Sequence, residues 1–165
     1  MKKLNLSTSS RLKGFTLIEL LIVIGIIAIL AAIIYVAVDP ARRLAEARNA
    51  ERWSSVNSIL NAYLKYTVDN AGTEPVTLVA GSYYMVGTGA DATGCTAQNT
   101  TLITNLSTNL VDEYLSSIPI DPFTAGADAT KTYYYITKST NGRITAGACT
   151  PESVGGTTPT IKVSR

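Results

Sequence analysis

The feature that most constrains this chain is an apolar run near its N-terminus, long enough to cross a membrane. In residues 20–38, only Gly25, Tyr35 and four alanines depart from Leu, Ile and Val. A spanning helix needs about 20 such residues. Glu19 stands directly before the run and costs on the order of 3 kcal/mol in a bilayer, whereas the Leu, Ile and Val residues together favour insertion by about 6 kcal/mol. We therefore expect a membrane-inserted helix in which Glu19 serves a purpose other than insertion.

The heptad at residues 13–19, with the sequence Lys-Gly-Phe-Thr-Leu-Ile-Glu, leads into this run. It resembles the processing site of type IV prepilins and of the pseudopilins of type II secretion. In that family a membrane peptidase cuts after the glycine and methylates the new N-terminal residue. The resemblance implies cleavage between Gly14 and Phe15, followed by N-methylation of Phe15.

Glu19 would then be the fifth residue of the mature chain. The resemblance implies that its carboxylate sets the register of assembly by meeting the terminal amine of a neighbouring subunit. The physical chemistry agrees, because a buried acid and a buried ammonium each become tolerable in apolar surroundings only when they are paired.

Two other interpretations of the N-terminus stay open. A secretory signal peptide has an apolar region of at most about 15 residues and then a small-residue cleavage site. Here the run is longer and reaches Asp39, Pro40 and two arginines without such a site. The main rival is an uncleaved signal anchor that holds an extracellular binding or adhesin domain. That interpretation gives no role to Gly14 or Glu19.

The charge distribution bears on orientation and on partners. The 165 residues carry a net charge of +2, but four basic residues precede the proposed cut, which leaves 10 basic against 12 acidic side chains and a mature net charge of −2. Those four favour a cytoplasmic N-terminus; they are Lys2, Lys3, Arg11 and Lys13. Four arginines beyond the run weaken that argument: Arg42, Arg43, Arg48 and Arg52. Since no strong basic patch is evident, direct nucleic acid binding is not expected.

The chain has two cysteines, Cys95 and Cys149, both in the part assigned to the outside. An oxidising compartment permits a disulfide there, and we expect the two to be bonded. Closing a loop of this length contributes roughly 4 kcal/mol in the chain-entropy model. The alternative is a pair of free buried thiols.

Four segments are expected: a leader at 1–14, a transmembrane or filament-core helix at 15–38, an amphipathic helical half at 39–70 and a globular head at 71–165. The predicted fold is α+β, a long N-terminal helix packed on a small antiparallel β-sheet head, as in pilins. Asp39 and Pro40 predict a break between the helical halves, with Asp39 capping the second. The second helical half is predicted to bury a stripe of residues that recur every three or four positions: Leu44, Ala47, Ala50, Trp53, Val56, Leu60, Tyr63, Leu64 and Thr67.

Short β-prone runs dominate the head. Strands are predicted at 76–80, 82–86, 132–137, 143–148 and 160–163, with Asn141 and Gly142 forming the turn of an antiparallel hairpin. Residues 87–94 are expected to be a mobile loop, and 106–117 a short helix that ends near Pro119. The stretch 114–123 resembles the passage from helix to sheet in pseudopilins; an ordinary helix end locked by two prolines explains it as well.

The chemistry of the chain argues against an enzyme. It has no histidine, the commonest general base and zinc ligand, and no phosphate-binding glycine loop or nucleophile elbow. No cofactor or bound metal is expected. One alternative is kept: Asp112 with Glu113, or Asp121 with Asp128, could hold calcium in an external loop. Solvated acids at helix and turn ends explain these residues equally well.

These observations favour a structural subunit of a type IV pilus or a type II secretion pseudopilus. The expected partners are identical or related pilin subunits, the prepilin peptidase and methyltransferase, the inner-membrane assembly platform, and membrane lipid before assembly. The expected location is the cytoplasmic (inner) membrane, single-pass with the head outside, and then an extracellular pilus or a periplasmic pseudopilus. A major or minor pilin, a pseudopilin and a DNA-uptake pilin stay open.

Overall fold

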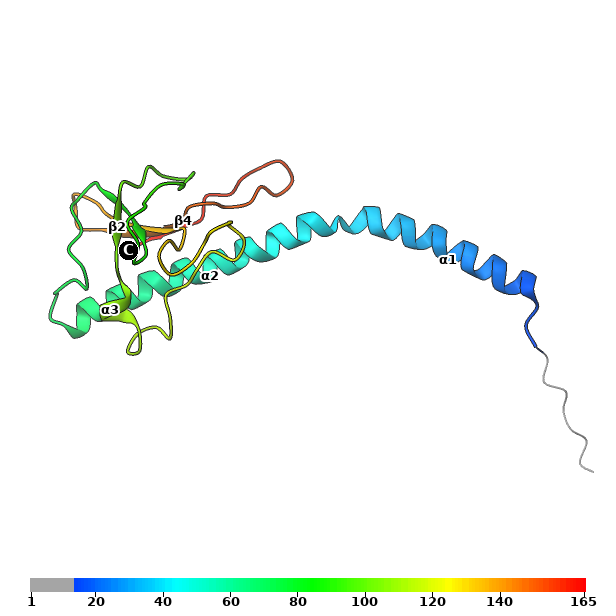
Figure 1. The fold of residues 1–165 in the computed structure, drawn as a ribbon, viewed down its shortest axis with the longest axis horizontal. Helices are drawn as coiled ribbons and strands as arrows, with labels where there is room; N and C mark the ends of the chain where they lie inside the picture. The colour runs from blue at the N-terminus through cyan, green and yellow to red at the C-terminus, as the bar shows by residue number, and fades with distance from the viewer. Residues whose placement is uncertain (1–13) are drawn as a thin grey trace, which may run out of the picture. The chain divides into compact units, whose positions relative to one another are not determined.

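The structure, a computed structural model, describes residues 14–165; the predicted leader therefore lies outside the described residues except for Gly14. The elements follow in the order α1, α2, β1, β2, α3, β3, β4, β5. The chain divides into two compact units, one that ends at Pro40 and one at Ala41–Arg165. Figure 1 colours both units by residue number.

The described part of the first unit is mainly α1 (Leu17–Val38), and no residue of this helix is buried. Asp39 ends this helix in the left-handed region, with φ 44° and ψ 76°, and α2 (Pro40–Asp69) begins at the next residue. Proline suits a first helical position because its missing N–H would have no intrahelical partner there. The predicted break is confirmed, but the structure places Asp39 as the C-cap of α1.

The second unit is built on a five-stranded sheet in the order β2-β1-β3-β4-β5. Its strands are β1 (Tyr83–Val86), β2 (Leu102–Thr104), β3 (Tyr134–Lys138), β4 (Ile144–Ala148) and β5 (Lys162–Ser164). The pairs β1–β3, β3–β4 and β4–β5 are antiparallel, whereas β1–β2 is parallel. The α+β class is confirmed, and the head sheet is mixed, not purely antiparallel.

Most strand predictions agree with the structure, and the exceptions have local causes. The run at 76–80 forms no strand, and β2 was not predicted because its three residues are too few for an alternating pattern. The helix predicted at 106–117 shortens to α3 (Ser107–Leu110). The β3–β4 hairpin is confirmed, since Gly142 adopts φ 80° and its N–H donates to the Ser139 carbonyl at 3.0 Å.

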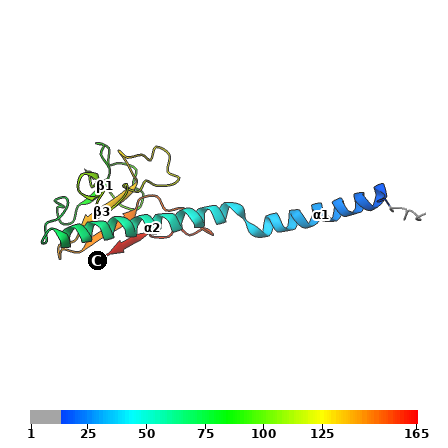
Figure 2. The same cartoon turned by 90° about the horizontal axis from the view of Figure 1, so that it is seen from below.

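The main core lies between the sheet and α2, which runs along one sheet face (Figure 2). Alternate residues of β3, Tyr134 and Ile136, face α2 and are fully buried. The helix contributes buried Val56, Ile59, Leu60, Ala62 and Tyr63 to the same core. The predicted stripe is therefore right in the second half of α2. It is wrong in the first half, where Leu44 and Trp53 are 55% and 40% exposed.

A second, smaller core covers the opposite face of the sheet. It joins Met85, Tyr135 and Cys149 with Ala92, which comes from the connection between β1 and β2. Residues 87–94 of this connection were expected to be mobile, but the connection is anchored at several points. The Lys131 Nζ lies 2.6 Å from an Asp91 carboxylate oxygen, and Cβ atoms added at Gly87 would lie 2.2 Å from the Thr130 carbonyl oxygen. The glycines thus permit close packing in this connection.

Candidate functional site

The predicted processing site is a short segment without regular secondary structure, directly before α1. Phe15 is 85% exposed, and the adjoining Thr16 is extended, with φ −83° and ψ 152°. A Cβ atom added at Gly14 would meet no atom within 4 Å. The fold of the described residues therefore does not by itself require glycine at position 14.

Thr16 and Glu19 form a capping box at the start of α1. The Glu19 N–H donates to the Thr16 hydroxyl oxygen at 3.2 Å, and Glu19 Oε2 accepts from the Thr16 N–H at 2.8 Å. The Thr16 hydroxyl also donates to Glu19 Oε2 at 2.7 Å. Two backbone donors that a helix start leaves unpaired are thus satisfied. The Thr-x-x-Glu spacing signals this cap, although Thr16 was not singled out in the sequence.

Within residues 14–165, no basic side chain lies within 4.0 Å of Glu19. Among the described residues, the Glu19 carboxylate accepts hydrogen bonds from Thr16. Pairing of Glu19 with the amine of a neighbouring subunit stays a prediction.

The surface of α1 consists of large apolar side chains that no other part of the described chain covers. Its exposed members include Leu17 at 88% and Val36 at 79%. The stretch Leu17–Asp69 contains a window of mean hydropathy 3.2, which qualifies it by length and composition as a candidate membrane span. The 22 residues of α1 extend about 33 Å, enough for a bilayer core of about 30 Å.

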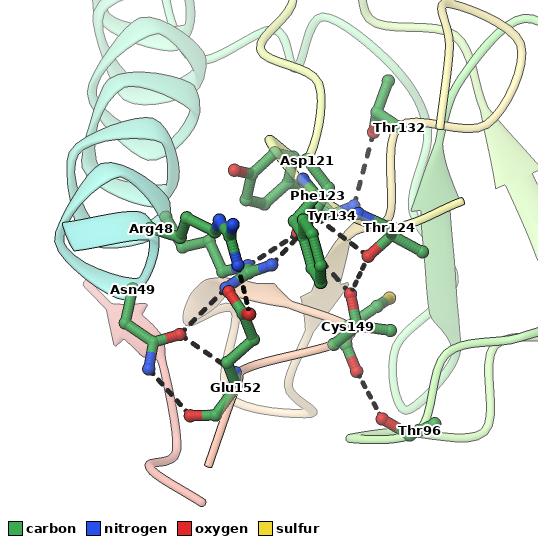
Figure 3. Close-up of polar contacts among 12 residues, drawn as sticks. Arg48, Asn49, Thr96, Asp121, Phe123, Thr124, Thr132, Tyr134, Cys149 and Glu152 are labelled. Atoms are coloured by element: carbon green, nitrogen blue, oxygen red, sulfur yellow. Dashed lines mark hydrogen bonds and ion pairs between the residues drawn. The ribbon is translucent and has the colours of Figure 1, made fainter. Parts of the chain in front are cut away.

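A buried ion cluster in the head was not predicted, and Figure 3 shows it. Arg52, which directly precedes the exposed Trp53 in α2, is fully buried. Its guanidinium donates to both carboxylate oxygens of Asp121, at 2.7 and 3.0 Å, and to Glu152 Oε2 at 2.9 Å. The predicted buried stripe did not include Arg52, because a charged side chain occupies the buried face only when its partners come from remote segments.

The neighbouring turn of α2 extends the same cluster. Asn49 is buried; its amide donates to the Glu152 carbonyl at 2.8 Å, and its oxygen accepts from the Glu152 N–H at 3.0 Å. Arg48 pairs with Glu152 Oε1 at 2.9 Å, and its guanidinium lies 3.7 Å from the centre of the Phe123 ring. One face of α2 thus holds the 121–123 and 152 segments together.

The cluster shifts the titration of its two central groups. Burial alone would raise the pKa of Asp121. Hydrogen bonds from Arg52 and from the N–H groups of Phe123 and Thr124 lower this pKa by more than burial raises it, so the pKa of Asp121 is below its usual value. Burial alone would lower the pKa of Arg52, and hydrogen bonds to Asp121 and Glu152 raise it overall. Both side chains therefore stay ionised at neutral pH.

Two of the acids considered for calcium, Asp121 and Asp128, take other roles here. Asp121 is bound to Arg52, and Asp128 accepts from the Thr130 N–H at 2.8 Å. No group of three His, Cys, Asp or Glu side chains that could hold a metal occurs in residues 14–165.

The structure also contains the Cys95–Cys149 disulfide, which joins the β1–β2 connection to the end of β4.

Comparison with known proteins gives one family match. The model of the prokaryotic N-terminal methylation motif matches residues 9–35, which include Gly14, Phe15, Thr16 and Glu19. No curated protein and no solved structure matches the chain significantly. The motif indicates a pilin-like substrate of the prepilin peptidase and favours a structural protein. It also implies assembly with other pilin subunits and, with the apolar helix, membrane anchoring.

The heptad at 13–19, the apolar helix that follows it and the α+β head agree with that match. This chain therefore carries, at residues 9–35, the signature of the type IV pilins and pseudopilins.

Proposed function

We propose that this chain is a structural subunit of a type IV pilus or a type II secretion pseudopilus. It is cut between Gly14 and Phe15, methylated on the Phe15 amine and assembled through α1. The observation that carries the proposal is the combination of the methylation motif with an apolar helix that has no buried residue. Such a helix needs lipid before assembly and neighbouring helices after it.

Lipid tails are as apolar as the side chains of α1, so hydrophobicity alone does not drive the helix out of the bilayer. Packing between helices and pairing of Glu19 with a neighbour's Phe15 amine bias the register, while the inner-membrane assembly platform supplies the work. The capping box gives Glu19 a local partner until then. The disulfide supports a head outside the cytoplasm, because such bonds persist in oxidising compartments.

The processing step is tested with a matched pair of glycine variants in cells that contain the prepilin peptidase. Gly14→Ala should leave the leader uncleaved, because the fold has open space at this position and only recognition by the peptidase is altered. Gly25→Ala, also in open space, is the control and should be processed normally. Intact-mass analysis should find a wild-type chain that begins with methylated Phe15.

The assembly step is tested with Glu19→Gln, which keeps a hydrogen-bond acceptor for Thr16 but removes the charge. The variant should be cut at the normal site and yield few or no filaments in sheared or membrane fractions. A wild-type chain that keeps residues 1–14 would refute the processing claim and favour an uncleaved anchor. Normal filament yield from Glu19→Gln would refute the pairing claim.

A further inference from the structure

A cavity of about 310 Å³ lies on the side of the head sheet that faces away from α2. It is lined by residues 96–98 of the β1–β2 connection, by Tyr135 and Ala148, and by residues 151 and 158–162 of the C-terminal segment. Pockets for small ligands start at about 300 Å³. This volume suits one small polar ring.

Two lining residues of the cavity, Tyr135 and Lys162, lie on the strands that flank β4. Tyr135 in β3 is paired with Gly147 in β4, which is paired with Lys162 in β5. Residues directly opposite one another share a sheet face. A Cβ atom added at Gly147 would lie 2.4 Å from the Tyr135 hydroxyl oxygen. Because Gly147 has no side chain, the Tyr135 phenol can lie across β4 toward Lys162.

The walls of the cavity are fixed by hydrogen bonds and by the disulfide. The Thr96 hydroxyl donates to the Cys149 carbonyl at 2.9 Å (Figure 3), and the Ala97 N–H donates to the same oxygen at 3.0 Å. On the other side, the Ala148 N–H donates to the Ile161 carbonyl at 2.9 Å. Both walls are thus joined through their backbone to the end of β4.

The lining has the chemistry of an anion site with hydroxyl recognition. Lys162 is its only charged residue, and no carboxylate lines it. Within the described chain, no acidic side chain lies within 4.0 Å of Lys162. Neutral donors and acceptors surround it, namely Thr96, Gln98, Tyr135, Thr158 and Thr160. A cation would find no counter-charge in this lining.

We propose that this cavity binds an acidic sugar, with the carboxylate on Lys162 and the ring hydroxyls on Gln98 and the threonines. Its accessibility in a filament rests on the proposed function: helices gather in the filament core, so the sheet face away from α2 points outward. Binding to a single subunit does not depend on assembly.

The test is an NMR titration of the full-length chain in detergent micelles, following backbone amide signals of the cavity residues. D-Glucuronate and D-glucose are the two probes, since they differ at one carbon that carries either a carboxylate or an alcohol. We expect glucuronate to bind about tenfold more tightly than glucose, because a hydrogen bond to a charged partner is stronger than one between neutral groups. Lys162→Gln should remove that preference.

Arg143→Gln is the matched control, because Arg143 is exposed, lies outside the cavity and carries the same charge. It should leave the preference for glucuronate unchanged. Equal binding of the two sugars, an equal loss in both variants, or no binding to the unaltered chain would each overturn the proposal. Lys162→Gln should still be processed and assembled normally, so failure of sugar binding and failure of filament assembly are separate outcomes.

Discussion

At the scale of single residues, Arg52 holds two remote segments of the chain against α2. Its partners Asp121 and Glu152 lie 69 and 100 residues away in sequence. Because the guanidinium is fully buried, removing it would leave the Asp121 carboxylate uncompensated in a medium of low polarity. Stability of the head therefore depends on this one side chain far more than on an exposed arginine.

Arg52→Ala should lower the free energy of unfolding by about 3–5 kcal/mol. Arg43→Ala is the control, since the Arg43–Glu46 pair is largely exposed and such pairs contribute at most about 1 kcal/mol. Urea unfolding of the full chain in detergent, followed by tryptophan fluorescence, measures both. Similar losses in the two variants would contradict a special role for Arg52.

The lowered pKa of Asp121 makes head stability dependent on pH. The contribution of the ionised carboxylate is fully present above its unfolded-state pKa of about 3.9. It is lost as the pH falls from there through the lower folded-state pKa, because the unfolded chain then binds the proton more tightly. Urea unfolding at a series of acidic pH values should show this loss in the wild type and a flatter dependence in Asp121→Asn. Equal slopes would exclude Asp121 as the cause.

At the scale of elements, the β1–β2 connection is a structural cover for the second face of the sheet. It carries Ala92 into the smaller core and is bound to the end of β4 through Cys95 and Cys149. Its length also permits the parallel pairing of β1 and β2, since parallel strands need a crossover of a dozen or more residues. The disulfide thus acts where the sheet would otherwise lose its cover.

Replacing both cysteines by serine should lower the free energy of unfolding by roughly 2–5 kcal/mol. Amide hydrogen exchange should rise first in residues 87–101, because the Lys131–Asp91 pair, in which Asp91 is 62% exposed, holds this connection only weakly. The α2 core should keep its protection. Uniform exchange across the whole head would show instead that the bond stabilises the head only globally.

At the scale of the whole molecule, the two units have opposite solvent requirements. The head has its own core between α2 and the sheet, whereas α1 contributes no buried residue. Residues 41–165 should therefore fold without α1 and give the same urea midpoint as the full chain in detergent, within the error of the fit. An aggregated or unfolded 41–165 fragment would contradict the independence of the head.

The sequence by itself determined the parts of this protein that depend on local pattern. The apolar run, the break at Asp39, the β3–β4 hairpin and the motif around Gly14 and Glu19 all follow from neighbouring residues. The Thr16 cap belongs to the same class, since its partner is three residues away.

Only the tertiary structure decided which polar side chains are buried and which apolar ones stay exposed. Arg52 and Asn49 occupy the buried face of α2 because Asp121 and Glu152 reach them from distant segments, while Leu44 and Trp53 remain at the surface. Helical periodicity assigns burial by hydrophobicity alone, so it cannot anticipate a charge whose desolvation is offset by a partner about 70 or more residues away. The same limit hid the cavity at Lys162, because its walls come from separate stretches of the chain between residues 96 and 162.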